Sequence, residues 1–132
     1  MKAITLYHWS KKWPFFAKLN CFLFNCEISP KAKIGKKVRL CHNGRGLIIG
    51  GTTTIKDKSM IYPYCLFGNK NQGYPTIEEN CKIYPKSIII GDITIGKNSI
   101  IGAGTFVDKD IPPNSIVYNY KKLIIKKRNK IN

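Results

Sequence analysis

Only two residues of this 132-residue chain, His8 and His42, carry an imidazole, the side chain whose ordinary pKa suits proton transfer at neutral pH. An imidazole that takes the proton of an attacking hydroxyl turns a poor nucleophile into a good one. His42 lies between Cys41 and Asn43 beside several glycines and outside the inward-facing rows described below, so burial does not account for it. One alternative is a turn residue whose ring is hydrogen-bonded to a neighbouring carbonyl. His42 is therefore the candidate general base, whereas His8, in an aromatic segment, is interpreted as structural.

A six-residue repeat is the element that must position these residues. An aliphatic residue recurs at every sixth position, and the residue four places after each is restricted in size. The aliphatic positions are Ile77, Ile83, Ile89, Ile95, Ile101 and Val107, and the restricted ones are Cys81, Ser87, Ile93, Ser99, Thr105 and Ile111. Short strands joined by tight corners and wound into a coil produce this period. Ordinary antiparallel strands would alternate at period two.

The same period extends towards the N-terminus. It includes Ile28, Ile34 and Leu40 and then, after a shift in register, Ile49, Ile55, Ile61 and Phe67. Residues 68–76 are rich in Gly, Asn, Gln, Tyr and Pro, which is typical of a loop that leaves the coil. We therefore expect an all-β solenoid, a single parallel β-helix from Ile28 to about Val117 that is interrupted twice. A coil this short has open ends, which caps or partner subunits should cover.

Residues 4–24 carry aromatic and aliphatic side chains at helical spacing, interrupted by Pro14. This pattern predicts two short helices that cap the open end of the coil. In a second interpretation, the aromatics and the lysines Lys11, Lys12 and Lys18 make peripheral contact with the inner face of a membrane. A membrane-spanning helix is not expected, because the apolar run is broken well short of about twenty residues. The predicted division is a helical cap (1–26), a β-helix domain (27–117) and a basic tail (118–132).

The formal net charge is +16. Abundant Lys, Ile and Asn are what an AT-rich coding sequence produces, so net charge alone indicates no function. The basic residues near the C-terminus lack interleaved aromatics, so we expect no nucleic-acid partner. Five cysteines are an odd number, and polar residues between Tyr7 and Lys12 interrupt any secretory signal. We expect a cytoplasmic protein with reduced thiols.

Several motifs together identify a family. They are the hexapeptide repeats, the stretch from Cys41 to Gly50, the break near Gly68, the segment from Gly73 to Ile77, and the ending from Ile101 to Pro113. In combination they resemble the serine acetyltransferase-like branch of the left-handed β-helix acyltransferases, in particular the O-acetyltransferases of surface polysaccharide synthesis. The resemblance implies a left-handed coil, a homotrimer, and acetyl transfer from acetyl-CoA to a hydroxyl.

The resemblance also implies roles for individual residues. His42 matches the catalytic histidine, and Glu27, fifteen residues earlier, matches the aspartate that orients it; a coil of about three hexads would place Glu27 on the preceding turn. Backbone N–H groups near the loop would stabilise the oxyanion. Cys41 and Tyr74 stand where serine acetyltransferases use aspartate and histidine to hold serine. A sugar hydroxyl is therefore the expected acceptor, with serine as one alternative and a degenerate, partner-binding solenoid as another.

The acetyl-CoA site is inferred from the same resemblance. Its candidate residues are Gly68, Tyr84, Lys86, Gly102, Ala103, Gly104, Lys121 and Lys122. Tyr84-Pro85-Lys86 stands where many relatives have a small triplet that lets the pantetheine arm approach the backbone, whereas Gly102-Ala103-Gly104 retains that triplet one coil later. Lys121 and Lys122 fall where relatives carry basic side chains for the phosphates of coenzyme A. No metal is expected, because the zinc enzymes of this fold need three histidines at each metal site.

Overall fold

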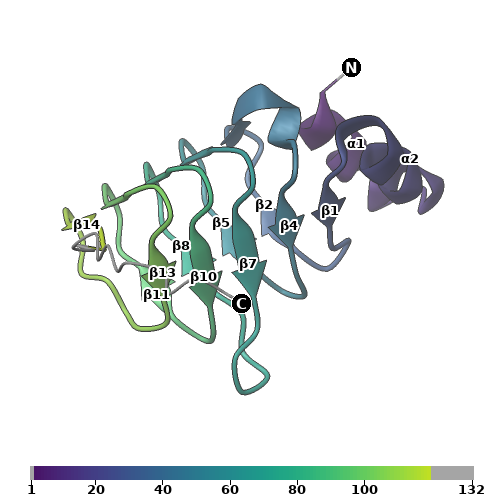
Figure 1. The fold of residues 1–132 in the computed structure, drawn as a ribbon. Helices are drawn as coiled ribbons and strands as arrows, with labels where there is room; N and C mark the ends of the chain where they lie inside the picture. The colour runs from purple at the N-terminus through teal and green to yellow at the C-terminus, as the bar shows by residue number, and fades with distance from the viewer. Residues whose placement is uncertain (1, 120–132) are drawn as a thin grey trace, which may run out of the picture.

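The computed structural model describes residues 2–119. Its chain winds as a left-handed coil of parallel strands, with two helices at the N-terminal end (Figure 1). The expected all-β solenoid with a short N-terminal helical cap is confirmed.

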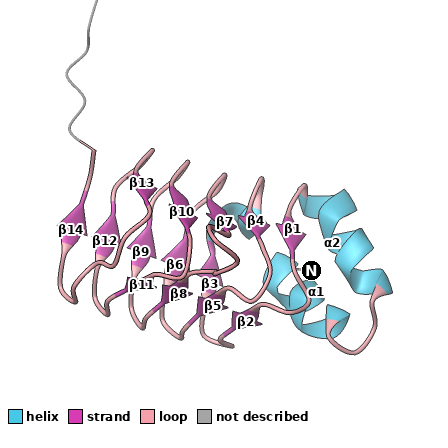
Figure 2. Ribbon diagram, turned by 90° about the horizontal axis from the view of Figure 1, so that it is seen from below, coloured by secondary structure: helices cyan, strands magenta, loops and turns pink. Residues whose placement is uncertain are grey.

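Three parallel sheets form the walls of the coil, and Figure 2 shows their strands from below. The first sheet contains β1 (Glu27–Ile28), β4 (Ile48–Ile49), β7 (Leu66–Gly68), β10 (Ile88–Ile90) and β13 (Phe106–Val107). The second contains β2 (Lys33–Ile34), β5 (Thr54–Ile55), β8 (Thr76–Ile77) and β11 (Thr94–Ile95). The third contains β3 (Arg39–Leu40), β6 (Met60–Ile61), β9 (Lys82–Ile83), β12 (Ile100–Ile101) and β14 (Ile116–Val117).

The core consists of the aliphatic row of each sheet, stacked coil upon coil. Ile55, Ile61 and Ile95, for example, are at most 1% exposed, and full burial of each such side chain contributes about 1.5–3 kcal/mol. The small inward residues fill the corners and satisfy backbone carbonyls there. Ser87 Oγ donates to the carbonyl of Tyr84 at 2.7 Å, and Thr53 Oγ1 donates to that of Gly50 at 2.7 Å. This explains why those positions prefer small hydroxyl-bearing or thiol side chains.

Three irregularities interrupt the repeat, one more than the sequence predicted. The 3₁₀ turn η1 (Cys41–Gly44) follows β3, and the loop 68–76, with a bridge between Lys70 and Gly73, leaves the coil after β7. The third irregularity is a shortened corner after Val107. Ile111 pairs with Ile95 and therefore lies in the aliphatic row, so its assignment to the size-restricted positions was wrong.

The helices α1 (Ala3–Ser10) and α2 (Phe15–Phe24) lie over the first coil, joined by a turn at Pro14. Helix α1 packs against η1 and β3, and α2 packs against β1. The hydroxyl of Tyr7 donates to the carbonyl of Ala32 and accepts the N–H of Ile34 at 3.3 Å. The cap thus satisfies backbone groups at the open edge of the second sheet. Neither described helix is long and apolar enough to cross a membrane.

Candidate functional site

His42 lies on η1, where the third sheet turns into the first. Both His42 (φ 50°) and Asn43 (φ 55°) have left-handed backbone conformations, which cost about 1–2 kcal/mol for each residue other than glycine. Gly44 (φ +69°) continues the bend beneath α1, where an added Cβ would meet Leu47 at 3.2 Å. The turn is closed by a hydrogen bond from the Arg45 N–H to the His42 carbonyl at 3.3 Å. The same left-handed conformation recurs at other corners of the coil, for example at Lys86 (φ 62°) and Asn98 (φ 60°), so the exposed imidazole and not the backbone conformation distinguishes this turn.

A cavity of about 680 Å³ opens beside this turn, in the size range of small-molecule sites. Helix α1 and the residue before it form one side, and the third sheet forms the other. The lining residues are Lys2, Ala3, Ile4, Val38, Arg39, Leu40, Cys41, His42, Asn43, Met60 and Tyr62. Its described lining contains cations and apolar groups but no carboxylate.

Cys41 lines the same cavity as His42 and is mostly buried. Burial raises the pKa of its thiol, although the nearby Arg39 acts in the opposite direction. Cys41 is therefore a neutral, compact wall of the cavity at neutral pH, consistent with its predicted place beside the acceptor.

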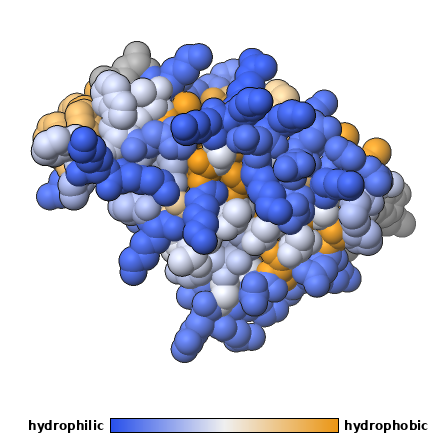
Figure 3. All heavy atoms as spheres, turned by 180° about the vertical axis from the view of Figure 1, so that it is seen from behind, coloured by the Kyte–Doolittle hydropathy of each residue, from blue (hydrophilic) through white to orange (hydrophobic). Residues whose placement is uncertain are grey.

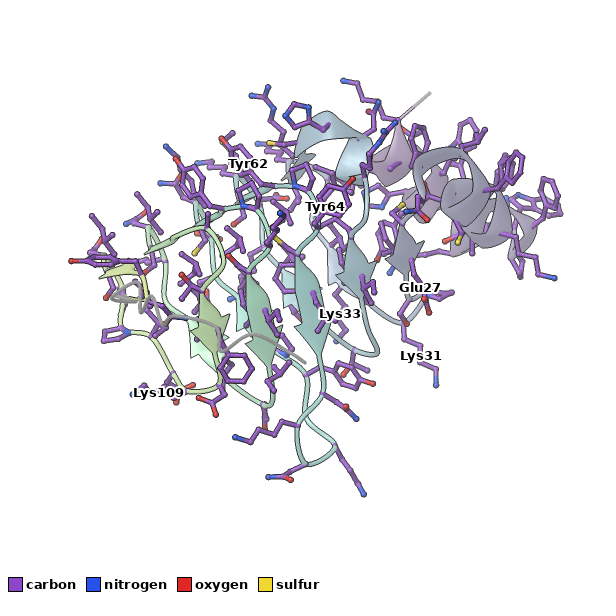
Figure 4. All side chains as sticks on the ribbon, in the orientation of Figure 1. Glu27, Lys31, Lys33, Tyr62, Tyr64 and Lys109 are labelled. Carbon is purple, nitrogen blue, oxygen red and sulfur yellow. The ribbon has the colours of Figure 1, made fainter. Side chains whose placement is uncertain are left out.

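The structure aligns several predicted residues along one edge of the coil. We call this the histidine edge; it comprises the turns from the third to the first sheet, at residues 41–47, 62–65, 84–87 and 102–105. The rings of Tyr62 and Tyr84 are stacked there, with centroids 4.8 Å apart. Figure 4 shows Tyr62 and Tyr64 at the edge that carries η1. His42 and the predicted acetyl-CoA residues Tyr84, Lys86 and 102–104 therefore share one edge.

The glycines of this edge differ in what they require. Gly104 has a φ of +66°, and an added Cβ would meet nothing within 4 Å, so its backbone conformation is the constraint. At Gly102 an added Cβ would meet Tyr118 Cβ at 3.1 Å, so close packing is the constraint. Lys86 (φ 62°) adopts the left-handed conformation at the position equivalent to Gly104. A non-glycine residue at that position leaves the path of the backbone unchanged.

Tyr74 and Gly68 do not lie on this edge. Gly68 is the last residue of β7, and Tyr74 lies in the loop that follows it, between the first and second sheets. The ring of Tyr74 packs over Gly51, where an added Cβ would approach the ring to 2.1 Å. Neither residue lines the cavity beside His42. Within one chain, the structure does not bring Tyr74 and His42 together.

Glu27 is the predicted partner of His42, but its register differs from the one expected. Glu27 pairs with Ile48 in the first sheet, because η1 lengthens this coil, so the fifteen-residue count does not describe one turn. The side chain is exposed, no hydrogen bond joins it to His42 within the described residues, and Figure 4 shows it beside β1. Its orienting role stays a prediction. Lys121 and Lys122 lie outside the described residues.

Arg39, Met60 and Tyr62 line the same cavity as His42, and none of them was predicted from the sequence. Arg39 and Met60 point outward from paired positions of β3 and β6. The six-residue period gives this pairing once the sheets are numbered, so it could have identified both residues. The contribution of Ile4 depends on how α1 packs and has no signal in the repeat.

Comparisons with known proteins agree with this fold. Residues 74–109 match the family model described as bacterial transferase hexapeptide (six repeats). A serine acetyltransferase of Bacillus pumilus is 32% identical over 121 residues, which cover 88% of this chain and 55% of that protein. A serine acetyltransferase of Staphylococcus epidermidis is 36% identical over 114 residues, which cover 83% of this chain and 53% of that protein. The chain thus spans little more than half the length of these relatives.

Solved structures give the same result. The crystal structure of Neisseria gonorrhoeae serine acetyltransferase in complex with serine matches with a TM-score of 0.83 and 26% identity, covering 89% of this chain and 53% of that one. Serine acetyltransferase from Brucella abortus matches with a TM-score of 0.81 and 26% identity, covering 90% of this chain and 53% of that one. The chain thus carries the bacterial transferase hexapeptide repeat, and in sequence and fold it is similar to serine acetyltransferases over about half of their length.

Proposed function

We propose that this protein is an acetyl-CoA-dependent O-acetyltransferase in which His42 is the general base. The observation that carries the proposal is an exposed imidazole on a strained turn, facing a cavity of about 680 Å³. The similarity to serine acetyltransferases supports the same chemistry. Structural packing does not explain His42, because its side chain is exposed and η1 is closed by backbone hydrogen bonds.

The proposed reaction is a direct acyl transfer. His42 removes the proton of the acceptor hydroxyl as its oxygen attacks the thioester carbonyl carbon. The carbonyl π bond opens, and backbone N–H groups of the loop stabilise the resulting oxyanion. Collapse of this intermediate re-forms the carbonyl and breaks the carbon–sulfur bond, and the imidazolium returns its proton to the departing coenzyme A thiolate. The products are an acetyl ester and free coenzyme A.

Acetyl-CoA would lie along the histidine edge. This edge begins at His42, passes Tyr84 and Lys86, and reaches Gly102, Ala103 and Gly104. The stacked rings of Tyr62 and Tyr84 give this edge an aromatic surface in place of a small triplet. We propose that the pantetheine arm follows this edge towards Gly102, and that Lys121 and Lys122 contribute positive charge for the phosphates. Because Gly68 does not lie on the histidine edge of its own chain, it would contact acetyl-CoA only from a neighbouring subunit.

The acceptor has two candidates. The names of the relatives favour serine, because each of them is a serine acetyltransferase. The composition of the cavity favours a neutral hydroxyl compound such as a sugar, because its described lining has no carboxylate for the ammonium group of an amino acid. Cys41, at one of the positions that would hold serine, adds no negative charge at neutral pH, because burial raises the pKa of its thiol.

Calorimetry tests the binding of acetyl-CoA, and product analysis then identifies the acceptor. Titration with acetyl-CoA should show saturable binding at about one site per chain. The protein is then incubated with acetyl-CoA and either serine or a panel of sugars, and acetyl esters are detected by mass spectrometry. An ester of serine selects the first acceptor and a sugar ester selects the second. If acetyl-CoA does not bind at millimolar concentration, the chain is a non-catalytic solenoid and the proposal is wrong.

Assembly and the remaining site residues belong to the same proposal. A homotrimer would bring the 68–76 loop and Tyr74 of one chain towards the histidine edge of the next. Light scattering tests whether the protein in solution has the mass of a trimer. Glu27 is proposed to orient the His42 ring. Glu27→Gln should lower kcat and leave KM for acetyl-CoA unchanged, whereas a merely structural residue would change thermal stability and not the kcat.

We also propose a cytoplasmic location with peripheral contact at the inner face of a membrane. The exposed fractions of Trp9, Trp13, Phe15 and Phe22 are 48%, 59%, 68% and 85%. Residues 2–26 include lysines and no Asp or Glu, so this surface suits anionic lipid. Sedimentation with anionic vesicles should retain the protein, and Phe15→Ser/Phe22→Ser should release it. Equal sedimentation of the two proteins would contradict the membrane contact.

A further inference from the structure

A second cavity lies on a different edge of the coil from the histidine edge. It has a volume of about 650 Å³ and lies between α1 and the turns that join the second sheet to the third. Its lining residues are His8, Lys11, Lys33, Ile34, Gly35, Lys36, Lys37, Thr54, Ile55, Lys56, Asp57 and Glu79. None of them lines the cavity beside His42. The acyl-transfer proposal uses none of these residues.

The charged groups of this cavity are mostly cationic, with five lysines against the carboxylates of Asp57 and Glu79. Two of the lysines have partners: Lys56 pairs with Glu78 at 2.8 Å, and Lys11 donates to the carbonyl of Ala32 at 3.0 Å. Figure 3 shows the molecule from behind, with hydrophilic residues over much of that face.

The other three lysines, Lys33, Lys36 and Lys37, form no ion pair within the part of the chain that the structure describes. They come from β2 and from the turn that follows it. All three lie on one short segment and line the same cavity, where the carboxylates of Asp57 and Glu79 offset only part of their positive charge.

The carboxylate of Asp57 forms no ion pair with these lysines within the described residues and has a structural role instead. Its Oδ1 accepts the backbone N–H of Lys37 at 3.0 Å and lies so close to Gly35 that an added Cβ there would approach it to 2.1 Å. The carboxylate is therefore used to close the turn at residues 35–37. The ammonium groups of Lys36 and Lys37 are left available for a ligand.

His8 provides an independent observation at the same place. Its Nε2 atom is buried and has no hydrogen-bond partner within the described residues. Burial lowers the pKa of His8, and Lys11 and Lys36 lower it further. Buried polar atoms in native proteins nearly always have a partner. An anion with several acceptor oxygens would supply one and would also offset the charges that depress this pKa.

We propose that this cavity binds a phosphate group, held by Lys33, Lys36 and Lys37 and accepting a hydrogen bond from His8 Nε2. A phosphate dianion provides both the charge and the tetrahedral set of acceptors that these groups need. The site is independent of the proposed acyl transfer. Its ligand is either free phosphate or the phosphate of a small phosphomonoester.

The two histidines allow a direct test by NMR, because His8 lines this cavity and His42 lines the other. The imidazole resonances are followed as sodium phosphate replaces sodium chloride at constant ionic strength. We expect a saturable shift of the His8 resonance at millimolar phosphate and a rise in its pKa, with no change at His42. A larger protonated fraction of His8 at a given pH near neutrality would then mark the bound state.

Matched variants separate a site from general attraction. Lys36→Gln/Lys37→Gln should weaken the His8 response about tenfold, whereas Lys31→Gln/Lys109→Gln, which removes the same charge from exposed lysines elsewhere (Figure 4), should leave it unchanged. Equal weakening by both pairs, or equal shifts of both histidines, would overturn the proposal. A stronger response to glycerol phosphate than to inorganic phosphate identifies a phosphomonoester as the ligand, and equal responses identify the free ion.

Discussion

Tyr7→Phe tests how the helical cap is attached to the coil. The ring of Tyr7 is 1% exposed, and its hydroxyl bridges the carbonyl of Ala32 and the N–H of Ile34. Phenylalanine keeps the ring packing and removes only the hydroxyl. The Ala32 carbonyl retains a hydrogen bond from Lys11 at 3.0 Å, so the Ile34 N–H is the group left without a partner.

The expected destabilisation follows from these contacts. Loss of a hydrogen bond costs about 1 kcal/mol, and a buried orphaned N–H adds about 1–2 kcal/mol. Tyr7→Phe should therefore lower the free energy of unfolding by about 2–3 kcal/mol. The same change at Tyr118, which is 68% exposed, is the matched control and should stay within about 0.5 kcal/mol of the wild type.

Urea unfolding provides the measurement and locates the loss. Both tryptophans, Trp9 and Trp13, are in the cap, whereas far-ultraviolet circular dichroism reports on the cap and the coil together. If the hydroxyl attaches the cap, tryptophan fluorescence should change at a lower urea concentration than circular dichroism in the variant. Coincident transitions with the wild-type midpoint would refute this account of the attachment. Because α1 forms one side of the His42 cavity, early release of the cap should also weaken acetyl-CoA binding.

Two further substitutions test the packing. Gly51→Ala should lower the free energy of unfolding by about 2–3 kcal/mol, because alanine is strained at a φ of +43° and its Cβ would displace the Tyr74 ring. Gly104→Ala, with open space around it, should lower it by only about 1 kcal/mol. Thermal unfolding measures both losses, and equal losses would contradict the contact between Gly51 and Tyr74. Burial raises the pKa of the Cys65 thiol to about 11 from 9.0. Its thiolate forms more readily in the unfolded chain, so stability is retained below pH 9 and lost as pH rises towards 11. Between neutral pH and about pH 10.5, the free energy of unfolding of the wild type should fall by about 2 kcal/mol more than that of Cys65→Ala, as measured by urea unfolding. If the free energies of unfolding of the two proteins change in parallel with pH, burial does not suppress this ionisation.

The coil was predictable because its determinants are local and periodic. Every aliphatic position from Ile77 to Val107 keeps the six-residue spacing, and each fills the same place in successive turns. Ile111 was misassigned because an isoleucine fits either inward row, and only the pairing with Ile95 distinguishes them.

The candidate site was predictable only in part. The strained turn at His42 follows from its glycine-rich surroundings, which lie close in sequence. The position of Glu27 depended on the length of one coil, which η1 changes, and the position of Tyr74 depended on how a loop folds back over Gly51. Met60 lies in the cavity through its pairing with Arg39, which the six-residue period implies once the coils are aligned. Tertiary packing decided the placements of Glu27 and Tyr74.

The most direct test of the central claim is the rate at which free coenzyme A is released from acetyl-CoA in the presence of the acceptor. His42→Ala should lower this rate by about 10²–10⁴-fold while circular dichroism and acetyl-CoA affinity stay as in the wild type, because only the proton acceptor is lost. His8→Gln, which changes the other histidine, should keep the wild-type rate. An unchanged rate in His42→Ala would contradict the assignment of His42 as the general base.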